Sequence, residues 1–349
     1  MVSFSLFLET LASNPFLAVV IVLVLGTIFV NGATDAANAI AESVGTRSIG
    51  INAAIAMSVV CNFVGLVLMS LISTAVADTI SGMVDFGGDS HAALIALAAA
   101  TVGIVAWGIG AWLFGIPTSE SHALIAGLTG AALAVQGGFN GVNGAEWIKV
   151  IYGLILSTVL GFGAGWGITK LIQRLCRNVD RRRADNAFGG LQVLGSAFVA
   201  LMHGAQDGQK FMSTAMLAIV LSVGANISDV QGFPLWIEVL CAATMALGTA
   251  VGGKRIIKKV GMEMANLEKY QGFAASLSAS ASLLIATLTG LPVSTTHTKT
   301  AAIMGAGAAK NIRSVRWQVA KEMVFTWVFT FPGCGIIGFV LAKVFLVLF

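Results

Sequence analysis

The stretch PTSESH, residues 117–122, interrupts a long apolar segment, and the similar stretch PVSTTH follows at residues 292–297. A second pair of motifs, GATD at 32–35 and GAQD at 204–207, is also embedded in apolar sequence. The partners are 175 and 172 residues apart, about half of the 349-residue chain. This spacing indicates an internal duplication. Polar motifs at membrane depth, present once in each half, are typical of a secondary transporter.

The composition predicts a membrane protein. Hydrophobic residues make up 57% of the chain and charged residues 10%, whereas soluble domains have about 25% charged residues. Long apolar runs occupy 16–30, 51–72, 92–114, 150–168, 191–202, 233–251, 273–288 and 323–349. Several exceed the roughly 18 residues that indicate a spanning helix, and the alternating segments of a β-barrel are absent. We therefore expect an all-α polytopic membrane protein.

The basic residues predict the orientation of the chain. Of 20 Lys and Arg residues, 16 fall in four places, namely Arg47 and the stretches 170–183, 254–269 and 310–321. The loops at 76–92, 136–147 and 224–234 contain none. Because positively charged loops stay in the cytoplasm, we expect these four places inside the cell and both termini outside. The net charge of +4 therefore does not indicate binding to nucleic acid.

Two apolar segments begin and end on the same side in this topology. The segment from residue 92 returns to the outside, so it has to turn back near 115–119. The segment 271–310 returns to the cytoplasm and turns back near 290–294. We expect two re-entrant helical hairpins that enter from opposite faces, with tips that meet near the midplane.

The expected fold is therefore an inverted-topology repeat with broken helices. Its parts are a first repeat at 1–175, a short basic cytoplasmic linker at 176–188 and a second repeat at 189–349.

The hairpin tips carry the residue types of an anion site. Pro ends one half-helix, and Ser or Thr caps the next, whose free N–H groups attract anions. Ser119 and Ser121 supply hydroxyl groups at one tip, and Ser294, Thr295 and Thr296 supply them at the other. Helix capping alone is the alternative explanation. Two matching tips favour an anion site.

The two other motifs predict helix breaks with buried carboxylates. Asp35 and Asn38 are three residues apart and share a helix face. An Asp at the bilayer centre costs about 2.5–3.5 kcal/mol and needs a partner. Asp35, Asn38 and unwound carbonyl groups would suit a hard monovalent cation; hydrogen bonds to helix ends are the alternative.

The second motif differs from the first, because Lys210 stands where the first has Asn38. Either Lys210 forms a salt bridge with Asp207, or its ammonium takes the place of a second bound cation. Gln206 is placed to reach an oxygen atom of a ligand.

Several other polar residues remain open to two interpretations. His122, His203 and His297 are proton shuttles or structural histidines. Lys299 attracts an anion or extends to the cytoplasmic face. Glu120 pairs with a cation or with a lysine.

The stretches GATDAANA (32–39), PTSESH, HGAQDGQK (203–210) and PVSTTH resemble the inorganic phosphate transporter (PiT) family, across essentially the whole chain. Members of that family carry phosphate inward with sodium or protons. The resemblance implies a cation site formed by Asp35, Asn38 and Asp207. It implies a phosphate site formed by Ser119, Ser121, Gln206, Ser294, Thr295 and Thr296.

The chain also departs from the family pattern. Thr34 and Gln206 stand where Asn is common in the family, and Asn62 and Ser276 stand near positions where many members carry Glu. These departures leave the identity and number of the cations open.

We expect a secondary active transporter in the cell membrane that imports inorganic phosphate in symport with sodium or protons, by alternating access. One negative charge entering a cell at about −100 mV costs roughly 2.3 kcal/mol, so co-transported cations are needed. The sequence has no Walker motif for ATP. It has no nucleophile–base pair of an enzyme, and it indicates no cofactor besides the co-transported sodium.

Two alternatives stay open. One is a sulfate permease of the same fold. The other is a passive anion channel, although such a pore would not need Asp35 and Asp207. The expected partners are phosphate, sodium or a proton, and the lipid bilayer, and not nucleic acid. The sequence leaves the oligomeric state open, a homodimer included.

Overall fold

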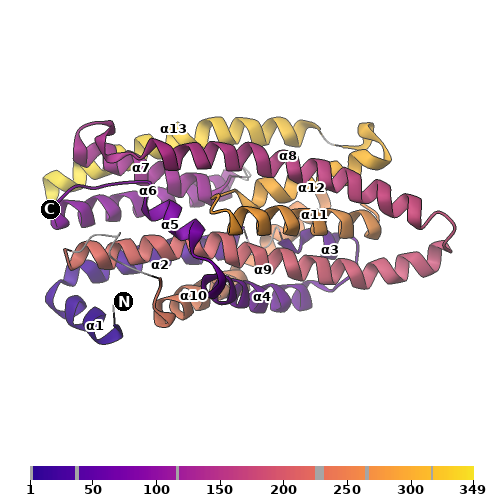
Figure 1. The fold of residues 1–349 in the computed structure, drawn as a ribbon, viewed down its shortest axis with the longest axis horizontal. Coiled ribbons are helices and arrows are strands. Elements are labelled where there is room, and N and C mark those ends of the chain that lie inside the picture. Colours follow the sequence, from indigo (N-terminus) through magenta and orange to yellow (C-terminus); the bar gives the residue numbers. More distant parts are fainter. Residues whose placement is uncertain (1–2, 36–38, 115–117, 225–231, 264–266, 316) are drawn as a thin grey trace.

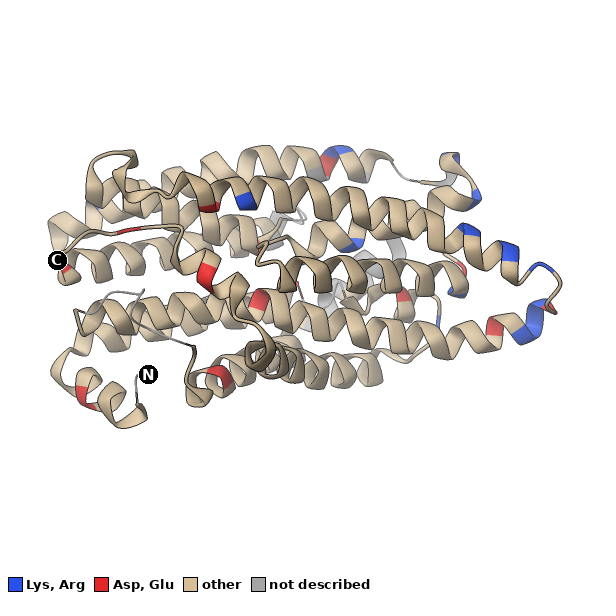
Figure 2. Ribbon diagram, in the orientation of Figure 1, with Lys and Arg blue, Asp and Glu red and all other residues tan. Residues whose placement is uncertain are grey.

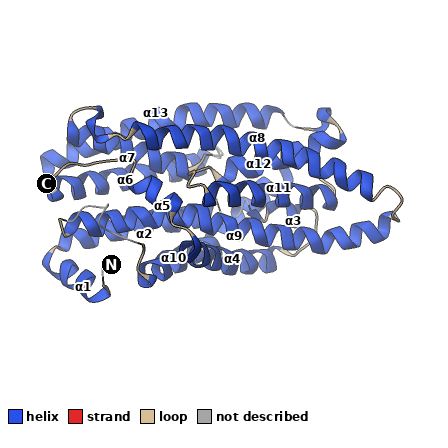
Figure 3. Cartoon of the chain, in the orientation of Figure 1, coloured by secondary structure: helices blue, strands red, loops and turns tan. Residues whose placement is uncertain are grey.

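The computed structural model describes residues 3–35, 39–114, 118–224, 232–263, 267–315 and 317–349. Within these ranges the chain is helical, apart from connecting loops and one isolated bridge between Val84 and Val142 (Figure 3). The helices are α1 (Phe4–Ser13), α2 (Pro15–Thr34), α3 (Ala41–Gly45), α4 (Ile51–Ile72), α5 (Ala75–Ser81), α6 (Ser90–Phe114), α7 (Glu120–Gln136), α8 (Gly144–Leu175), α9 (Arg181–Ser222), α10 (Leu235–Glu263), α11 (Lys269–Leu288), α12 (Thr295–Lys310) and α13 (Trp317–Leu348). Short 3₁₀ turns lie at Phe139–Gly141 and Ile312–Ser314.

Eight helices in the described part of the chain are long and apolar enough to cross a membrane. They are α2, α4, α6, α8, α9, α10, α11 and α13. Large apolar side chains are exposed along their outer faces, for example Leu71 on α4, Val159 on α8 and Val328 on α13. Such surfaces suit lipid chains rather than water. The all-α, multi-span membrane architecture expected from the sequence is confirmed.

Two helical hairpins occupy opposite ends of the bundle (Figure 1). The pair α6–α7 lies toward the end that holds both termini, and the pair α11–α12 lies toward the α8–α9 turn. The first hairpin packs against α13, and the second packs against α8. Each hairpin therefore rests on a long helix from the other half of the sequence, so the two halves interlock.

The charges are distributed unevenly along the bundle (Figure 2). Lys and Arg residues gather around the α8–α9 turn, at the end opposite the termini. The sequence predicted a basic linker at 176–188, and α9 already begins at Arg181, so residues 181–188 are helical. The long helices α8 and α9 carry this basic turn well beyond the second hairpin.

The first predicted helix break agrees with the structure, and the second is wrong. Helix α2 ends at Thr34, with Asp35 as its C-cap residue. In contrast, α9 continues without interruption through GAQD from Arg181 to Ser222. The glycines there serve packing, since a Cβ atom on Gly204 would lie 2.1 Å from the carbonyl oxygen of Asn62 on α4. One on Gly208 would lie 2.4 Å from the Leu66 side chain. Small residues of this kind let membrane helices approach closely.

Candidate functional site

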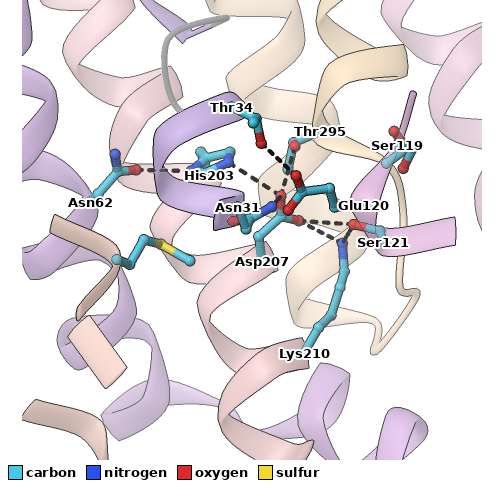
Figure 4. A network of polar contacts seen from close by, with 12 residues as sticks. Asn31, Thr34, Asn62, Ser119, Glu120, Ser121, His203, Asp207, Lys210 and Thr295 are labelled. Carbon is cyan, nitrogen blue, oxygen red and sulfur yellow. Dashed lines mark hydrogen bonds and ion pairs between the residues drawn. The ribbon is translucent and has the colours of Figure 1, made fainter. Parts of the chain in front are cut away.

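Asp207 on α9 is the centre of a buried polar network that joins four helices (Figure 4). Its Oδ1 accepts hydrogen bonds from Lys210 Nζ at 2.7 Å and from Ser121 Oγ at 3.2 Å. Its Oδ2 accepts from Thr295 Oγ1 at 3.0 Å and from Asn31 Nδ2 at 3.3 Å. A buried carboxylate is costly without such donors, so this network fixes the side chains around it.

The network brings the two hairpin tips together, as the sequence predicted. Ser121 comes from α7 and Thr295 from α12, and both hydroxyl groups donate to Asp207. The rings of His122 and His297, one residue or two further on, lie 5.0 Å apart between centroids. Residues from the two halves of the sequence therefore meet at one place.

Ser119 and Ser294 occupy matching positions as N-cap residues of α7 and α12. Ser119 Oγ accepts from the backbone N–H of His122 at 3.4 Å, and Ser294 Oγ accepts from that of His297 at 3.2 Å. The capping expected from the sequence is confirmed. Capping does not exclude a ligand, because a hydroxyl that accepts through its oxygen still has a hydrogen to donate.

The second tip is shaped by a turn after α11. Gly290 has a φ of 68°, in the left-handed region that favours glycine, and it follows the C-cap residue Thr289. A Cβ atom at Gly290 would also lie 3.0 Å from the Ala75 carbonyl oxygen. Glycine therefore follows the end of α11 here, and Ser294, in an extended conformation, is the N-cap residue of α12.

Lys210 lies between the two tips. Its ammonium donates to Ser121 Oγ at 2.9 Å on the first tip and to the backbone carbonyl of Val293 on the second. Its ion pair with Asp207 is fully buried. Of the two interpretations that the sequence left open for Lys210, the structure contains the salt bridge.

Buried polar atoms without a hydrogen-bond partner among the described residues surround these tips. Gln206 Nε2 donates to the Leu291 carbonyl at 3.1 Å, whereas its Oε1 accepts no hydrogen bond from a described residue. Nδ1 of His122 and both ring nitrogens of His297 are in the same situation. Buried polar groups in proteins are normally satisfied by protein, water or ligand. These atoms indicate a binding site for a polar ligand.

Two further carboxylates lie next to this network. Glu120 Oε1 accepts from Thr34 Oγ1 at 2.5 Å, and both Glu120 and Asp35 are buried. Thr296 hydrogen-bonds to Asp35. Asp35 is also close enough to Glu120 and Asp207 for electrostatic interaction with both carboxylates. Neither Asp35 nor Glu120 forms an ion pair with a described lysine or arginine. A cluster of three buried carboxylates around one lysine favours the presence of a further cation.

The residues predicted for the cation site are only partly described. Asp35 lies beside the tips, Asp207 is engaged with Lys210, and Asn38 lies outside the described residues. No three His, Cys, Asp or Glu side chains of the described chain form a cluster of metal-binding geometry. The groups near Asp35 are the carboxylates of Glu120 and Asp207 and the hydroxyl of Thr296, and they do not form such a cluster.

The sequence pointed to His203 and Asn62 but did not relate either of them to Asp207. His203 Nε2 lies 3.2 Å from Asp207 Oδ2, and its Nδ1 lies 3.0 Å from Asn62 Oδ1. Asn62 Nδ2 is directed at the hydroxyl groups of Ser58 and Thr249. His203 therefore lies between Asp207 and Asn62 and connects α9 to α4. The stretch HGAQDGQK already included His203, whereas Asn31 directly precedes GATD and a motif longer by one residue would have included it.

A cavity of about 430 Å³ lies elsewhere, at the α8–α9 turn. Gln173, Cys176, Phe188 and Tyr270 are among its lining residues, and none of the tip residues lines it. The polar chemistry described above is therefore separate from this cavity.

Comparison with known proteins identifies the family of this chain. The model of the phosphate transporter family matches residues 31–338. A probable low-affinity inorganic phosphate transporter of Bacillus subtilis is 35% identical, covering 89% of this chain and 91% of that protein. A protein of the same description from Mycobacterium tuberculosis is 36% identical, over 92% and 76% of the two chains. A solved structure described as the sodium-dependent phosphate transporter has the same fold, with a TM-score of 0.86. It is 22% identical and covers 96% of this chain and 100% of that one.

Proposed function

Because this chain belongs to the phosphate transporter family, we propose that it is a secondary active transporter that imports inorganic phosphate in symport with sodium, by alternating access. The family match and the relatives from Bacillus subtilis and Mycobacterium tuberculosis support phosphate as the substrate. The sodium dependence named for the protein of like fold supports sodium as the coupling ion.

The observation that carries this proposal is the meeting of two hydroxyl-lined helix N-termini around one buried lysine. Lys210 contacts Ser121 of the first tip and the Val293 carbonyl of the second. Free N–H groups at the start of α7 and α12, together with an ammonium, attract an anion. In the proposed phosphate site, the ligand is held by Ser119, Ser121, Gln206, Ser294, Thr295 and Thr296.

The tips also offer acceptors, and this supports phosphate rather than sulfate. Phosphate near neutral pH carries a P–O–H group that donates a hydrogen bond, whereas sulfate only accepts. Gln206 Oε1 is a buried acceptor without a partner among the described residues. Sulfate has no hydrogen to donate, so this buried acceptor would stay without a hydrogen bond if sulfate were bound.

The proposed cation site is centred on Asp35 and Asn38. Asp207, the third residue that the sequence predicted for it, already pairs with Lys210 and is the weaker ligand of the set. Asp35 is buried, lies near Glu120 and is not paired with a described lysine or arginine. A sodium ion there would offset the charge of these carboxylates and would bring positive charge in with the phosphate. Coupling of this kind provides the energy that an anion needs to enter a negatively charged cell.

The proposed orientation follows the charges. We place the α8–α9 turn in the cytoplasm and both termini outside the cell, because Lys and Arg concentrate at that turn (Figure 2). The segments 1–175 and 189–349 would be two repeats of opposite orientation, joined through 176–188.

Uptake of radiolabelled phosphate into proteoliposomes tests the proposal. Sodium and proton gradients are imposed separately, and unlabelled sulfate is offered as a competitor. We expect uptake to require an inward sodium gradient and to resist excess sulfate. Uptake that is driven by the phosphate gradient alone, without a cation gradient, would support a channel. Strong competition by sulfate would support a sulfate permease.

A further inference from the structure

A second buried ion pair lies next to the site and has no part in the proposed phosphate or cation binding. Lys299 on α12 pairs with Glu42 on α3, and their side chains are 3% and 5% exposed. Ser276 on α11 joins them, since its Oγ donates to Glu42 Oε1 at 2.6 Å and accepts from Lys299 Nζ at 3.0 Å. Three helices are therefore connected through one lysine.

Lys299 follows the hairpin tip on the same face of α12. It is three residues after Thr296 and four after Thr295, and these spacings place side chains above one another on a helix. Thr295 donates to Asp207, and Thr296 hydrogen-bonds to Asp35. One helical turn is about 5.4 Å, so the Lys299 side chain starts one turn from the tip.

The fold shows on which side of the tips Lys299 lies. Helix α12 runs from the tip in the middle of the bundle toward the end that carries the basic α8–α9 turn (Figure 1). An anion that moves from the tips toward that end, along this face, meets Lys299 first. Lys299 is thus placed where phosphate would leave the tips on the side that we assign to the cytoplasm.

Glu42 holds Lys299 incompletely. Its Oε1 accepts from both Lys299 and Ser276, whereas its buried Oε2 has no hydrogen-bond partner among the described residues. A buried carboxylate with one unsatisfied oxygen is bound less well than a fully satisfied one. An anion with several acceptor oxygens would satisfy Lys299 and the Ser276 hydroxyl equally well.

The segment that carries Glu42 is tied to the second half of the chain at its other end. Thr46 and Ser48 follow α3, and each hydroxyl donates to Oε1 of Gln192 on α9 at 2.8 Å. The segment 42–48 therefore lies closed against α9, α11 and α12. Glu42 also follows Asp35 by seven residues in the sequence.

We propose that Lys299 is a second anion-binding residue on the phosphate path, which Glu42 occupies in the present conformation and phosphate takes over when α3 moves away. This role rests on the proposed function. The exchange balances charge, because one anion replaces another on the same ammonium. It also keeps a buried ammonium paired throughout, as its low exposure requires.

The test compares Glu42→Gln with the double variant Glu42→Gln/Lys299→Met. The double variant removes both charges, so it leaves no unpaired buried ion. Lys310→Ala is the matched control, since Lys310 lies on the same helix and pairs with Glu268 at an exposed position. Proteoliposome uptake gives kcat and KM for phosphate, and binding in detergent gives the affinity of the tips.

We expect the double variant to lose at least about tenfold in kcat, as for one lost hydrogen bond to a charged group, with phosphate affinity at the tips within about threefold. Glu42→Gln alone keeps Lys299 and should transport better than the double variant. Lys310→Ala should match the wild-type protein. An ion pair that is merely structural predicts the reverse order, because Glu42→Gln alone would leave a lysine buried without its partner.

A second measurement decides the matter if the double variant does not fold. Phosphate should raise the Tm of Glu42→Gln more than that of the wild-type protein, because phosphate replaces the missing carboxylate. Equal or smaller shifts, or a double variant with wild-type kcat, would overturn the role of Lys299. Wild-type protein that takes up no phosphate would instead overturn the proposed function itself.

Discussion

The ammonium nitrogen of Lys210 lies 2.7 Å from Oδ1 of Asp207, and neither side chain is exposed. The same ammonium donates to Ser121 of the first hairpin and to the Val293 carbonyl of the second. A phosphate bound between the tips would therefore share Lys210 with Asp207. Because the two anions compete for one cation, phosphate binding and the strength of the Lys210–Asp207 pair are coupled.

The first prediction concerns the hydroxyl groups at the tips. Thr295→Ala should weaken phosphate binding by about 1.5–3 kcal/mol, the usual contribution of a hydrogen bond to a charged group. Isothermal titration of detergent-solubilised protein with phosphate measures this loss. Thr289→Ala is the control, since its exposed hydroxyl donates to the Ile285 carbonyl of its own helix. A structure with phosphate more than two helical turns from both tips would show that the site lies elsewhere.

The second prediction concerns the coupling cation. Asp35→Asn should abolish sodium-driven uptake and leave the protein folded, because the bound cation is the proposed partner of this buried carboxylate. Uptake at a series of sodium concentrations checks the expectation, with exposed Asp78→Asn as the control. Normal transport with unchanged sodium dependence would show that Asp35 has a structural role.

The third prediction tests the packing that keeps α9 continuous. A Cβ atom at Gly204 would lie 2.1 Å from the Asn62 carbonyl oxygen, so Gly204→Ala should force α4 and α9 apart. We expect a loss of about 1–3 kcal/mol in stability, as for other overpacked positions, and weaker phosphate uptake because Asp207 moves with α9. Thermal unfolding in detergent measures the stability.

The control for this prediction lies on the same helix. A Cβ atom at Gly190 would meet nothing within 4 Å. Gly190→Ala should therefore stabilise α9 by about 0.5–1 kcal/mol, the difference in helix propensity between the two residues. A Gly204→Ala protein as stable as Gly190→Ala would contradict the packing argument.

Local signals were sufficient for the hairpins. The sequence placed turns near 115–119 and 290–294. Residues 115–117 lie outside the described residues, and α7 and α12 begin at Glu120 and Thr295, directly after the two predicted turns. Ser119 and Ser294 cap these helices through hydrogen bonds to backbone groups three residues away. Such local contacts can be predicted from the sequence without knowledge of the fold. The same reasoning located Asp35 and Asp207 as buried carboxylates.

Tertiary contacts decided what the sequence did not reveal. The glycines of GAQD suggested a helix break. In the structure Gly204 instead allows close packing of α9 against α4, and the sequence alone does not show this contact. Lys299 and Glu42 are 257 positions apart, and no local pattern relates them. Asn31 donates to Asp207 across 176 positions. Such partners become visible only when helices from both halves are placed side by side.

The last prediction is that the two halves bind cations unequally. The first half offers Asp35, which has no described lysine or arginine partner, whereas Asp207 in the second half is already neutralised by Lys210. A sodium ion at Asp207 would lie close to the ammonium, and like charges at close range repel strongly in a buried site. We therefore expect a well-formed sodium site at Asp35 and none of equal affinity at Asp207.

Lys210→Met separates the two roles of this lysine. It leaves Asp207 buried without its ammonium, which should destabilise the protein by about 3–5 kcal/mol in the absence of sodium. Sodium should then restore much of that stability by entering at Asp207, and the Tm should depend on sodium more steeply than in the wild-type protein. Phosphate binding should be weaker than in the wild-type protein even with sodium present, because the variant lacks the Lys210 ammonium between the tips. A wild-type structure with two equally occupied sodium ions, bound by Asp35 and Asp207, would refute this asymmetry.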